Sequence, residues 1–140
     1  MNEQKEITIS TDKNKLNISL IHEFLTKSYW GKGRTFEQVK ISIENSLCWG
    51  MYLNDEQIGF ARVLTDGIVV AYLMDVFIIE KYRGNGYSKM LLDEIFAHND
   101  LQEIGKWVLA TKDAHDLYKQ FGFKAIENPE RLMARKNETL

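Results

Sequence analysis

A short glycine-containing turn stands between an apolar segment and the start of a helical pattern, and it offers the chemistry of an anion site. The turn reads Arg83-Gly84-Asn85-Gly86 and follows an apolar run that ends at Ile79. Glycines let the backbone turn sharply and present successive N–H groups, and a helix N-terminus carries about half a positive charge. With the cation of Arg83, this combination suits a phosphate or a pyrophosphate. Because turns also need glycine for steric reasons, a purely structural role stays open.

Two common phosphate-binding patterns are absent from this turn. The Walker pattern requires a lysine and then a serine or threonine after its last glycine, whereas Gly86 is followed by Tyr87 and Ser88. The dinucleotide fingerprint requires a third glycine or an alanine where Lys89 stands. The turn therefore indicates neither an ATPase nor an NAD-dependent enzyme.

Two further patterns could do chemistry. Asp75 interrupts the apolar stretch from Ile68 to Ile79, and a carboxylate in such a place is costly unless it is paired or hydrogen-bonded. Asp75 is therefore either a structural anchor or part of a site. Tyr29 and Trp30 lie beside flexible glycines and could cover a small hydrophobic or cationic ligand, because aromatic faces attract ammonium groups. The alternative is that they end the preceding helix by packing.

The elements that must position these residues follow from the spacing of apolar side chains. Thr35 and Gln38 are placed as a cap pair for a helix, and Gly122 can take the left-handed position that ends another. The expected elements are an edge strand over 6–10, helices over 16–27 and 36–47, strands over 47–53, 57–64 and 68–79, a helix that follows Gly86 and ends near 98 or 99, a strand over 106–110, a helix over 113–120 and one or two strands over 124–135.

The stretch from Ile68 to Ile79 is expected to be a central strand. It is apolar at almost every position rather than alternating, which predicts that both of its faces are covered. The two strands before it flank the polar turn Asn54-Asp55-Glu56 and should form a hairpin. The whole order predicts a mixed sheet covered by helices.

Length and charge bound the class of protein. A chain of 140 residues is expected to form a single domain, residues 1–140. Eighteen basic and twenty acidic residues give a net charge of −2 at pH 7, which argues against a dedicated nucleic-acid binder. We therefore expect no nucleic-acid partner.

Membrane, disulfide and zinc classes are also disfavoured. The longest apolar run, Ile68 to Met74, is seven residues, whereas a membrane span needs about 20. No secretory leader is visible at the N-terminus, so a cytoplasmic protein without a membrane partner is expected. The single cysteine, Cys48, excludes an internal disulfide, and the three histidines are too far apart for a zinc pattern, so no metal is expected.

Two motifs together resemble a known family. Arg83, Gly86 and Ser88 follow the pattern Arg-x-x-Gly-x-Gly/Ala except for the serine, and with the preceding Val76-Phe77-Ile78 strand they resemble the acetyl-coenzyme A binding motif of the GNAT superfamily of N-acetyltransferases. The later stretch from Ala114 to Phe123 looks like the helix that in this family ends in Tyr-x-x-x-Gly-Phe, here Tyr118 to Phe123. The order of elements is also the family's order, so the resemblance spans about Ile7 to Arg135.

The resemblance implies both a fold and a reaction. The fold is α/β (α+β), a GNAT-like mixed and mostly antiparallel central sheet of six to seven strands flanked by about four helices. The reaction is direct transfer of an acetyl group from acetyl-coenzyme A to a primary amine of a small molecule in a ternary complex, with no metal. Such a transfer requires removal of a proton from the amine, stabilisation of the thioester oxygen and protonation of the departing thiolate.

The resemblance also implies which residues hold the coenzyme. The N–H of Ile78 would stabilise the charge that develops on the thioester oxygen, and Tyr118 would donate a proton to the thiolate as general acid. The alternative for Tyr118 is a purely structural role, in which it packs on the inner face of its helix. Thr111 stands where the family often has an asparagine that touches pantetheine. The expected coenzyme-binding residues are Val76, Phe77, Ile78, Arg83, Gly84, Asn85, Gly86, Tyr87, Ser88, Thr111 and Tyr118.

The acceptor side resembles two subgroups only in part. The strand around Asp75 is similar to that of diamine acetyltransferases, but Met74 replaces the glutamate that precedes the aspartate there. Tyr72 stands where histone-type members carry their base glutamate. Asp75, acting through an ordered water chain, is therefore the predicted catalytic base. The expected acceptor-binding residues are Tyr29, Trp30, Tyr72 and Asp75.

Other functions remain open at this point. The alternative function within the same fold is a protein or peptide N-acetyltransferase. In that case the segment from Tyr29 to Arg34 would leave an open groove for the acceptor, whereas in a small-molecule enzyme it would close the acceptor cleft. A non-catalytic acyl-coenzyme A sensor and a plain α/β interaction domain are the rivals of other classes. Exposed edge strands of the tail could also pair two chains into a homodimer.

Overall fold

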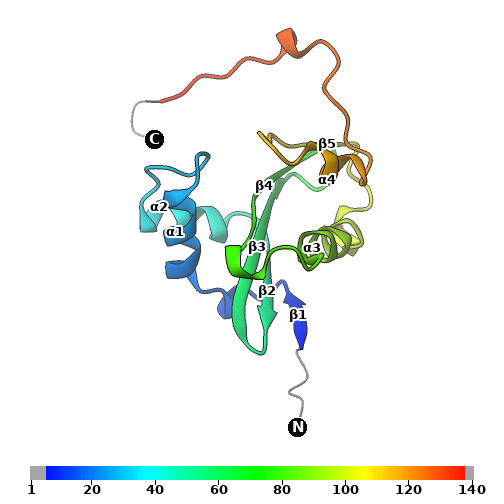
Figure 1. Ribbon diagram of the computed structural model, residues 1–140. Helices are drawn as coiled ribbons and strands as arrows, with labels where there is room; N and C mark the ends of the chain where they lie inside the picture. The colour runs from blue at the N-terminus through cyan, green and yellow to red at the C-terminus, as the bar shows by residue number, and fades with distance from the viewer. Residues whose placement is uncertain (1–5, 138–140) are drawn as a thin grey trace. The chain divides into compact units, whose positions relative to one another are not determined.

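The computed structural model describes residues 6–137, which form two compact units, residues 6–109 and 110–137. The prediction of a single domain over residues 1–140 stays a prediction. Among the described residues no helix is long and apolar enough to cross a bilayer. The first unit contains β1 (Ile7–Ser10), α1 (Ile18–Lys27), α2 (Phe36–Glu44), β2 (Leu47–Leu53), β3 (Glu56–Thr65), β4 (Val70–Ile78), α3 (Tyr87–Phe96) and β5 (Lys106–Val108), and the second contains α4 (His115–Lys119) (Figure 1).

The sheet is mixed and mostly antiparallel, as predicted, but it has five strands rather than six to seven. Its order is β1-β2-β3-β4-β5, and only the β4–β5 pair is parallel. The missing strands are those expected over 124–135, where the described chain forms only a short 3-10 turn, Pro129–Arg131. Asn128 takes a left-handed φ of 55°, and Pro129 has no N–H to donate to a neighbouring strand. These two residues therefore interrupt an extended backbone in the middle of this segment.

The helices begin where side chains cap their first N–H groups. Asn17 Oδ1 accepts from the N–H of Leu20 at 3.0 Å, so α1 begins at Ile18, two residues later than predicted. The predicted cap pair of α2 is confirmed as a capping box, in which Thr35 and Gln38 each bond the other's backbone N–H, at 3.1 and 2.8 Å. α2 ends at Glu44, before the predicted end, because β2 already begins at Leu47.

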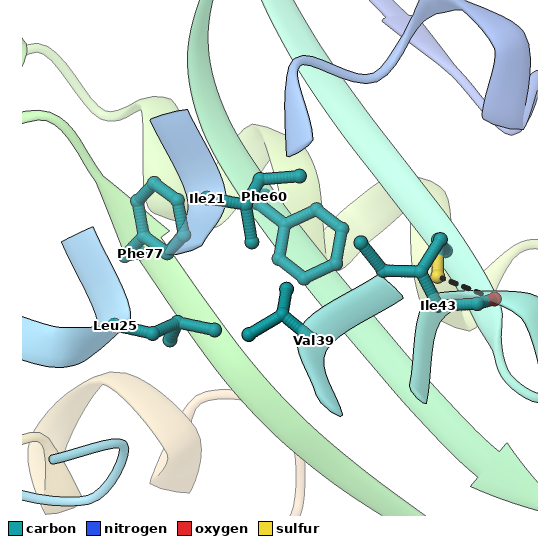
Figure 2. Close-up of a cluster of buried hydrophobic side chains, with 7 residues drawn as sticks. Ile21, Leu25, Val39, Ile43, Phe60 and Phe77 are labelled. Carbon is teal, nitrogen blue, oxygen red and sulfur yellow. Dashed lines mark hydrogen bonds between the residues drawn. The ribbon is translucent and has the colours of Figure 1, made fainter. Parts of the chain in front are cut away.

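Helices cover both faces of the sheet in the first unit. α1 and α2 lie on one side and α3 on the other (Figure 1). Side chains alternate along β2, so Cys48 faces α1 and α2 while the ring of Trp49 lies 5.6 Å from that of His98, just after α3. Figure 2 shows the core between the first two helices and the sheet, formed by Ile21, Leu25, Val39, Ile43, Cys48, Phe60 and Phe77.

The strand expected over 68–79 is shorter and less covered than predicted. β4 begins at Val70 because Asp66 Oδ1 accepts the N–H groups of Ile68, Val69 and Val70 and holds them in a turn. These hydrogen bonds also lower the pKa of the Asp66 carboxyl. β4 is an interior strand, between β3 and β5, but Val70 and Tyr72 are each 39% exposed. The prediction that both faces are covered was therefore wrong for its first half.

The hairpin turn between β2 and β3 yields a stability prediction. Asn54 and Asp55 have φ of 48° and 72°, the left-handed pair that favours Asn-Gly. Asp55→Gly should therefore raise the free energy of unfolding by about 0.5 kcal/mol, measured by urea denaturation. Asp93→Gly, at an exposed position within α3, is the control and should cost about 1 kcal/mol. A loss of stability in Asp55→Gly would contradict the turn assignment.

Candidate active site

The strand β4 leaves its neighbour β5 partway along its length. The parallel pairing covers only Val70 to Tyr72, opposite Lys106 to Val108, whereas β4 continues to Ile78. Within residues 6–109, residues 73–78 therefore have no partner strand on the β5 side. Peptide groups on such an open edge can pair with an added extended chain, as a peptide or a pantetheine arm would provide.

A bulge bends β4 just where it leaves β5. Phe60 pairs with Phe77 but Arg62 pairs with Met74, so β4 contains one residue more than β3 across this interval. The bulged residue is Asp75, whose φ of 57° is uncommon for a residue other than glycine. Such a conformation persists only where surrounding contacts hold it.

The contacts that hold Asp75 are four N–H donations to its carboxylate. Oδ1 accepts from Trp30 Nε1 at 3.1 Å and from Arg34 Nη1 at 2.9 Å. Oδ2 accepts from Arg34 Nη1 at 2.8 Å and from Arg62 Nε at 2.9 Å. The Asp75 side chain is only 1% exposed. Since a carboxylate offers about four lone-pair sites, these donors occupy the group fully.

Of the two roles open for Asp75 from the sequence, this geometry favours the structural anchor. The partners Arg34 and Arg62 were not among the expected site residues. One signal for Arg62 was present in the sequence, since it interrupts an apolar strand just as Asp75 does, and adjacent strands of a hairpin can bring two such charges together. The signal for the bulge was not visible, because a bulge changes no residue type.

The bulge brings the expected acceptor residues onto one face of the sheet. Leu64 pairs with Tyr72, and Leu64 and Arg62 share the face that Phe60 presents to α1 and α2. Tyr72 and Asp75 are three positions apart and would point to opposite faces of a regular strand. With one extra residue in β4, Asp75 reaches Arg62 on the face that carries Tyr72.

The segment between α1 and α2 lies on this same face. Trp30 is tied to Asp75, and its ring makes an edge contact with Tyr29 at 5.1 Å. Tyr29 and Trp30 are nevertheless 57% and 38% exposed. They therefore pack in part and still present aromatic surface, and their predicted role in covering a ligand stays a prediction.

The turn after β4 is open to solvent. Gly84 and Gly86 have φ of 83° and 77°, and a Cβ at either position would meet nothing within 4 Å. Gly86 is the N-cap of α3, and no side chain within residues 6–137 caps the helix, so its first N–H groups are available to a ligand. Arg83 Nε donates to the carbonyl of Ile78 at 3.0 Å, which fixes this cation beside the strand end. These features fit a phosphate or pyrophosphate group.

Thr111 and Tyr118 lie in the second unit and have local contacts there. Thr111 Oγ1 accepts the N–H of Ala114 at 3.1 Å, just before α4. The ring of Tyr118 makes an edge contact with Phe123, with centroids 5.9 Å apart. The left-handed position predicted for Gly122 is confirmed by its φ of 90°. The roles of Thr111 and Tyr118 toward the coenzyme stay predictions.

Cys48 is a buried structural residue, as expected. It is 2% exposed, and its Sγ lies 3.6 Å from the carbonyl oxygen of Ile43. Burial raises the pKa of the Cys48 thiol to about 11. Because the thiolate is the reactive form, this cysteine is not a nucleophile near neutral pH.

Comparison with known proteins places this arrangement in a family. The chain is 30% identical over 134 residues to the uncharacterised N-acetyltransferase ycf52 of Pyropia yezoensis, covering 91% of this chain and 75% of that one. A crystal structure from Xanthomonas campestris, described as belonging to the GNAT family, shares 42% identity and a TM-score of 0.91 over 96% of each chain. An aminoglycoside N-acetyltransferase solved with CoA has the same fold, with a TM-score of 0.72 over 97% of this chain and 98% of that one, at 14% identity. Residues 44–125 match the acetyltransferase (GNAT) domain. The chain therefore belongs to the GNAT family of acetyltransferases.

Proposed function

We propose that this acetyltransferase moves the acetyl group of acetyl-coenzyme A directly to a primary amine of a small molecule, in a ternary complex. The observation that carries the proposal is the open, uncapped N-terminus of α3 directly after the unpaired edge of β4. The CoA complex of the aminoglycoside N-acetyltransferase supports the same coenzyme here. The cytoplasmic location and the homodimer stay predictions.

The residues around the turn would hold the anionic part of the coenzyme. The N–H groups from Gly84 to Ser88 would donate to the pyrophosphate, and the guanidinium of Arg83 would add a positive charge. Val76, Phe77 and Ile78 would pair their peptide groups with the pantetheine amides. When bound, acetyl-coenzyme A supplies an acetyl group activated as a thioester.

Two groups of the chain would then handle charge and protons. The N–H of Ile78 would donate to the thioester oxygen as negative charge develops there. The phenol of Tyr118 would supply the proton for the departing sulfur, since a phenol is protonated at neutral pH. Asp75 acts on this site by holding Trp30 and Arg34 against β4, because its own oxygens are occupied.

A small acceptor is favoured over a protein or peptide. The segment from Tyr29 to Arg34 is fixed to β4 through two of its residues, Trp30 and Arg34, rather than standing away from the sheet. A segment held against the strand in this way leaves less room for an extended chain than for a small molecule. A protein acceptor would need this segment to release Asp75.

The turn after β4 gives a test of coenzyme binding. Gly86→Val should raise the dissociation constant for acetyl-coenzyme A at least about tenfold, measured by calorimetry, because a β-branched residue disfavours φ of 77° and distorts the N–H groups. Gly67→Val is the matched control, since Gly67 has φ of 87° and equally open surroundings in the β3–β4 turn. Equal affinities in both variants would refute the placement of the pyrophosphate.

The proton donor gives a second test. Tyr118→Phe should lower kcat about 100-fold while the affinity for acetyl-coenzyme A changes little, because only the acidic proton is removed. Tyr52→Phe is the control: the Tyr52 hydroxyl is buried and has no hydrogen-bond partner among the described residues, so its removal should leave kcat unchanged. A kcat in Tyr118→Phe equal to that of the wild type would leave Tyr118 as a packing residue.

A third test decides whether Asp75 is a structural anchor or the catalytic base. Asp75→Asn should lower the free energy of unfolding by about 3 kcal/mol in urea denaturation, because Arg34 and Arg62 lose their buried anion. Asparagine tolerates the left-handed φ of this position, so the backbone itself is not strained. Lys27→Gln, which removes an exposed pair with Glu23, should cost less than about 0.5 kcal/mol. Unchanged stability with a large loss of kcat would instead support Asp75 as the catalytic base.

A further inference from the structure

We infer that the acceptor of this enzyme is an amine that also bears a carboxylate, and that Arg34 binds this carboxylate. The inference rests on the proposed function and names the chemical class of its acceptor. It starts from the charges around Asp75. Two guanidinium groups, those of Arg34 and Arg62, face one carboxylate, so the cluster retains one positive charge.

Only one of the two guanidinium groups is able to take a ligand. Arg62 donates through Nε to Asp75 and through Nη1 to Ser46 Oγ at 3.1 Å, and its side chain is 7% exposed. Arg34 makes both of its contacts with Asp75 through Nη1 alone, and its side chain is 24% exposed. Among residues 6–137, no hydrogen-bond partner is found for Arg34 Nε or Nη2.

The unused edge of Arg34 has the geometry of a carboxylate site. Nε and Nη2 lie on one edge of the planar group and donate two parallel hydrogen bonds, the fork that matches the two oxygens of a carboxylate. Asp75 holds the opposite side of the same guanidinium, so the fork is already oriented. A preoriented donor loses less conformational entropy when a ligand binds.

The backbone of Arg34 is fixed as well. Its carbonyl oxygen accepts a hydrogen bond from His22 Nε2 at 3.0 Å, and α2 begins two residues later behind the capping box. The face that carries the fork also carries Tyr72, which is 39% exposed, next to the bulge where β4 leaves β5. A ligand on Arg34 is thereby placed at the acceptor side of the β4 edge.

The same charges disfavour a polyamine. The carboxylate that would attract a second ammonium group is Asp75, and its oxygens already accept four N–H donations. A second ammonium would instead meet the positive charge of Arg34. An acceptor with one amine and one carboxylate would instead place its carboxylate against the guanidinium of Arg34.

Matched pairs of amines test this inference. Tyrosine and tyramine, and lysine and cadaverine, differ only by a carboxylate. Calorimetry in the presence of CoA should give at least about tenfold lower dissociation constants for tyrosine and lysine than for their partners. Thiol release with acetyl-coenzyme A should show the same order in kcat/KM. Equal or weaker binding of the carboxylate-bearing members would overturn the inference.

Variants of Arg34 identify the group responsible. Arg34→Gln should remove the preference within each pair, and Arg34→Lys should restore part of it. Lys27→Gln, which removes an exposed cation from the neighbouring helix α1, should keep the preference. The preference is a ratio between two ligands of one protein, so a partly unfolded sample lowers both affinities and leaves the ratio unchanged. A preference that survives in Arg34→Gln would show that another group binds the carboxylate.

The outcomes for the acceptor class and for the reaction are separate. Acetyl transfer to amines without a preference for the carboxylate overturns this inference and leaves the proposed function in place. Absence of transfer to every amine overturns the proposed function, and the calorimetric comparison of the pairs then still decides whether Arg34 is a carboxylate site.

Discussion

A buried carboxylate at a bulge is the constraint on which the first unit depends. Asp75 lies inside the sheet with a left-handed φ, and both features are unfavourable unless they are compensated. The compensation comes from three residues on two parts of the chain, Trp30 and Arg34 between α1 and α2 and Arg62 on β3. Replacing such a cluster by apolar groups often costs no stability, so its value lies in specifying one arrangement of the loop on the strand.

The same bulge has consequences on both sides of β4. The strand leaves β5 after Tyr72, which opens the edge that would accept the pantetheine arm. The strand then ends at Ile78, whose carbonyl oxygen accepts a hydrogen bond from Arg83 Nε. This bond holds the glycine turn against the end of the strand. The proposed coenzyme side and the proposed acceptor side would therefore be set by one strand, and a change at the bulge would alter both.

Local features were predictable from the sequence, and long-range ones were less so. The capping box at Thr35 and the left-handed Gly122 depend on residues within a few positions, and both were predicted. The glycine turn was found for the same reason. Arg62 and Arg34 gain their importance from Asp75, which is distant in sequence and reached only through strand pairing and loop packing. Over residues 124–135 the prediction was wrong in another way. One or two strands were expected there, but Asn128 and Pro129 interrupt the extended backbone.

The hydrogen bonds of Asp75 also bear on how the proposed acceptor amine would lose its proton. An alkyl ammonium has an ordinary pKa of about 10.4, whereas an α-amino group without a nearby anion has one of about 8. In a free amino acid the adjacent carboxylate stabilises the ammonium and raises its pKa. If Arg34 pairs with that carboxylate, this stabilisation is withdrawn, and the amine becomes easier to deprotonate near neutral pH. A site of this kind needs a weaker base than one that acts on an alkyl amine, which agrees with a strand whose only carboxylate is already fully bonded.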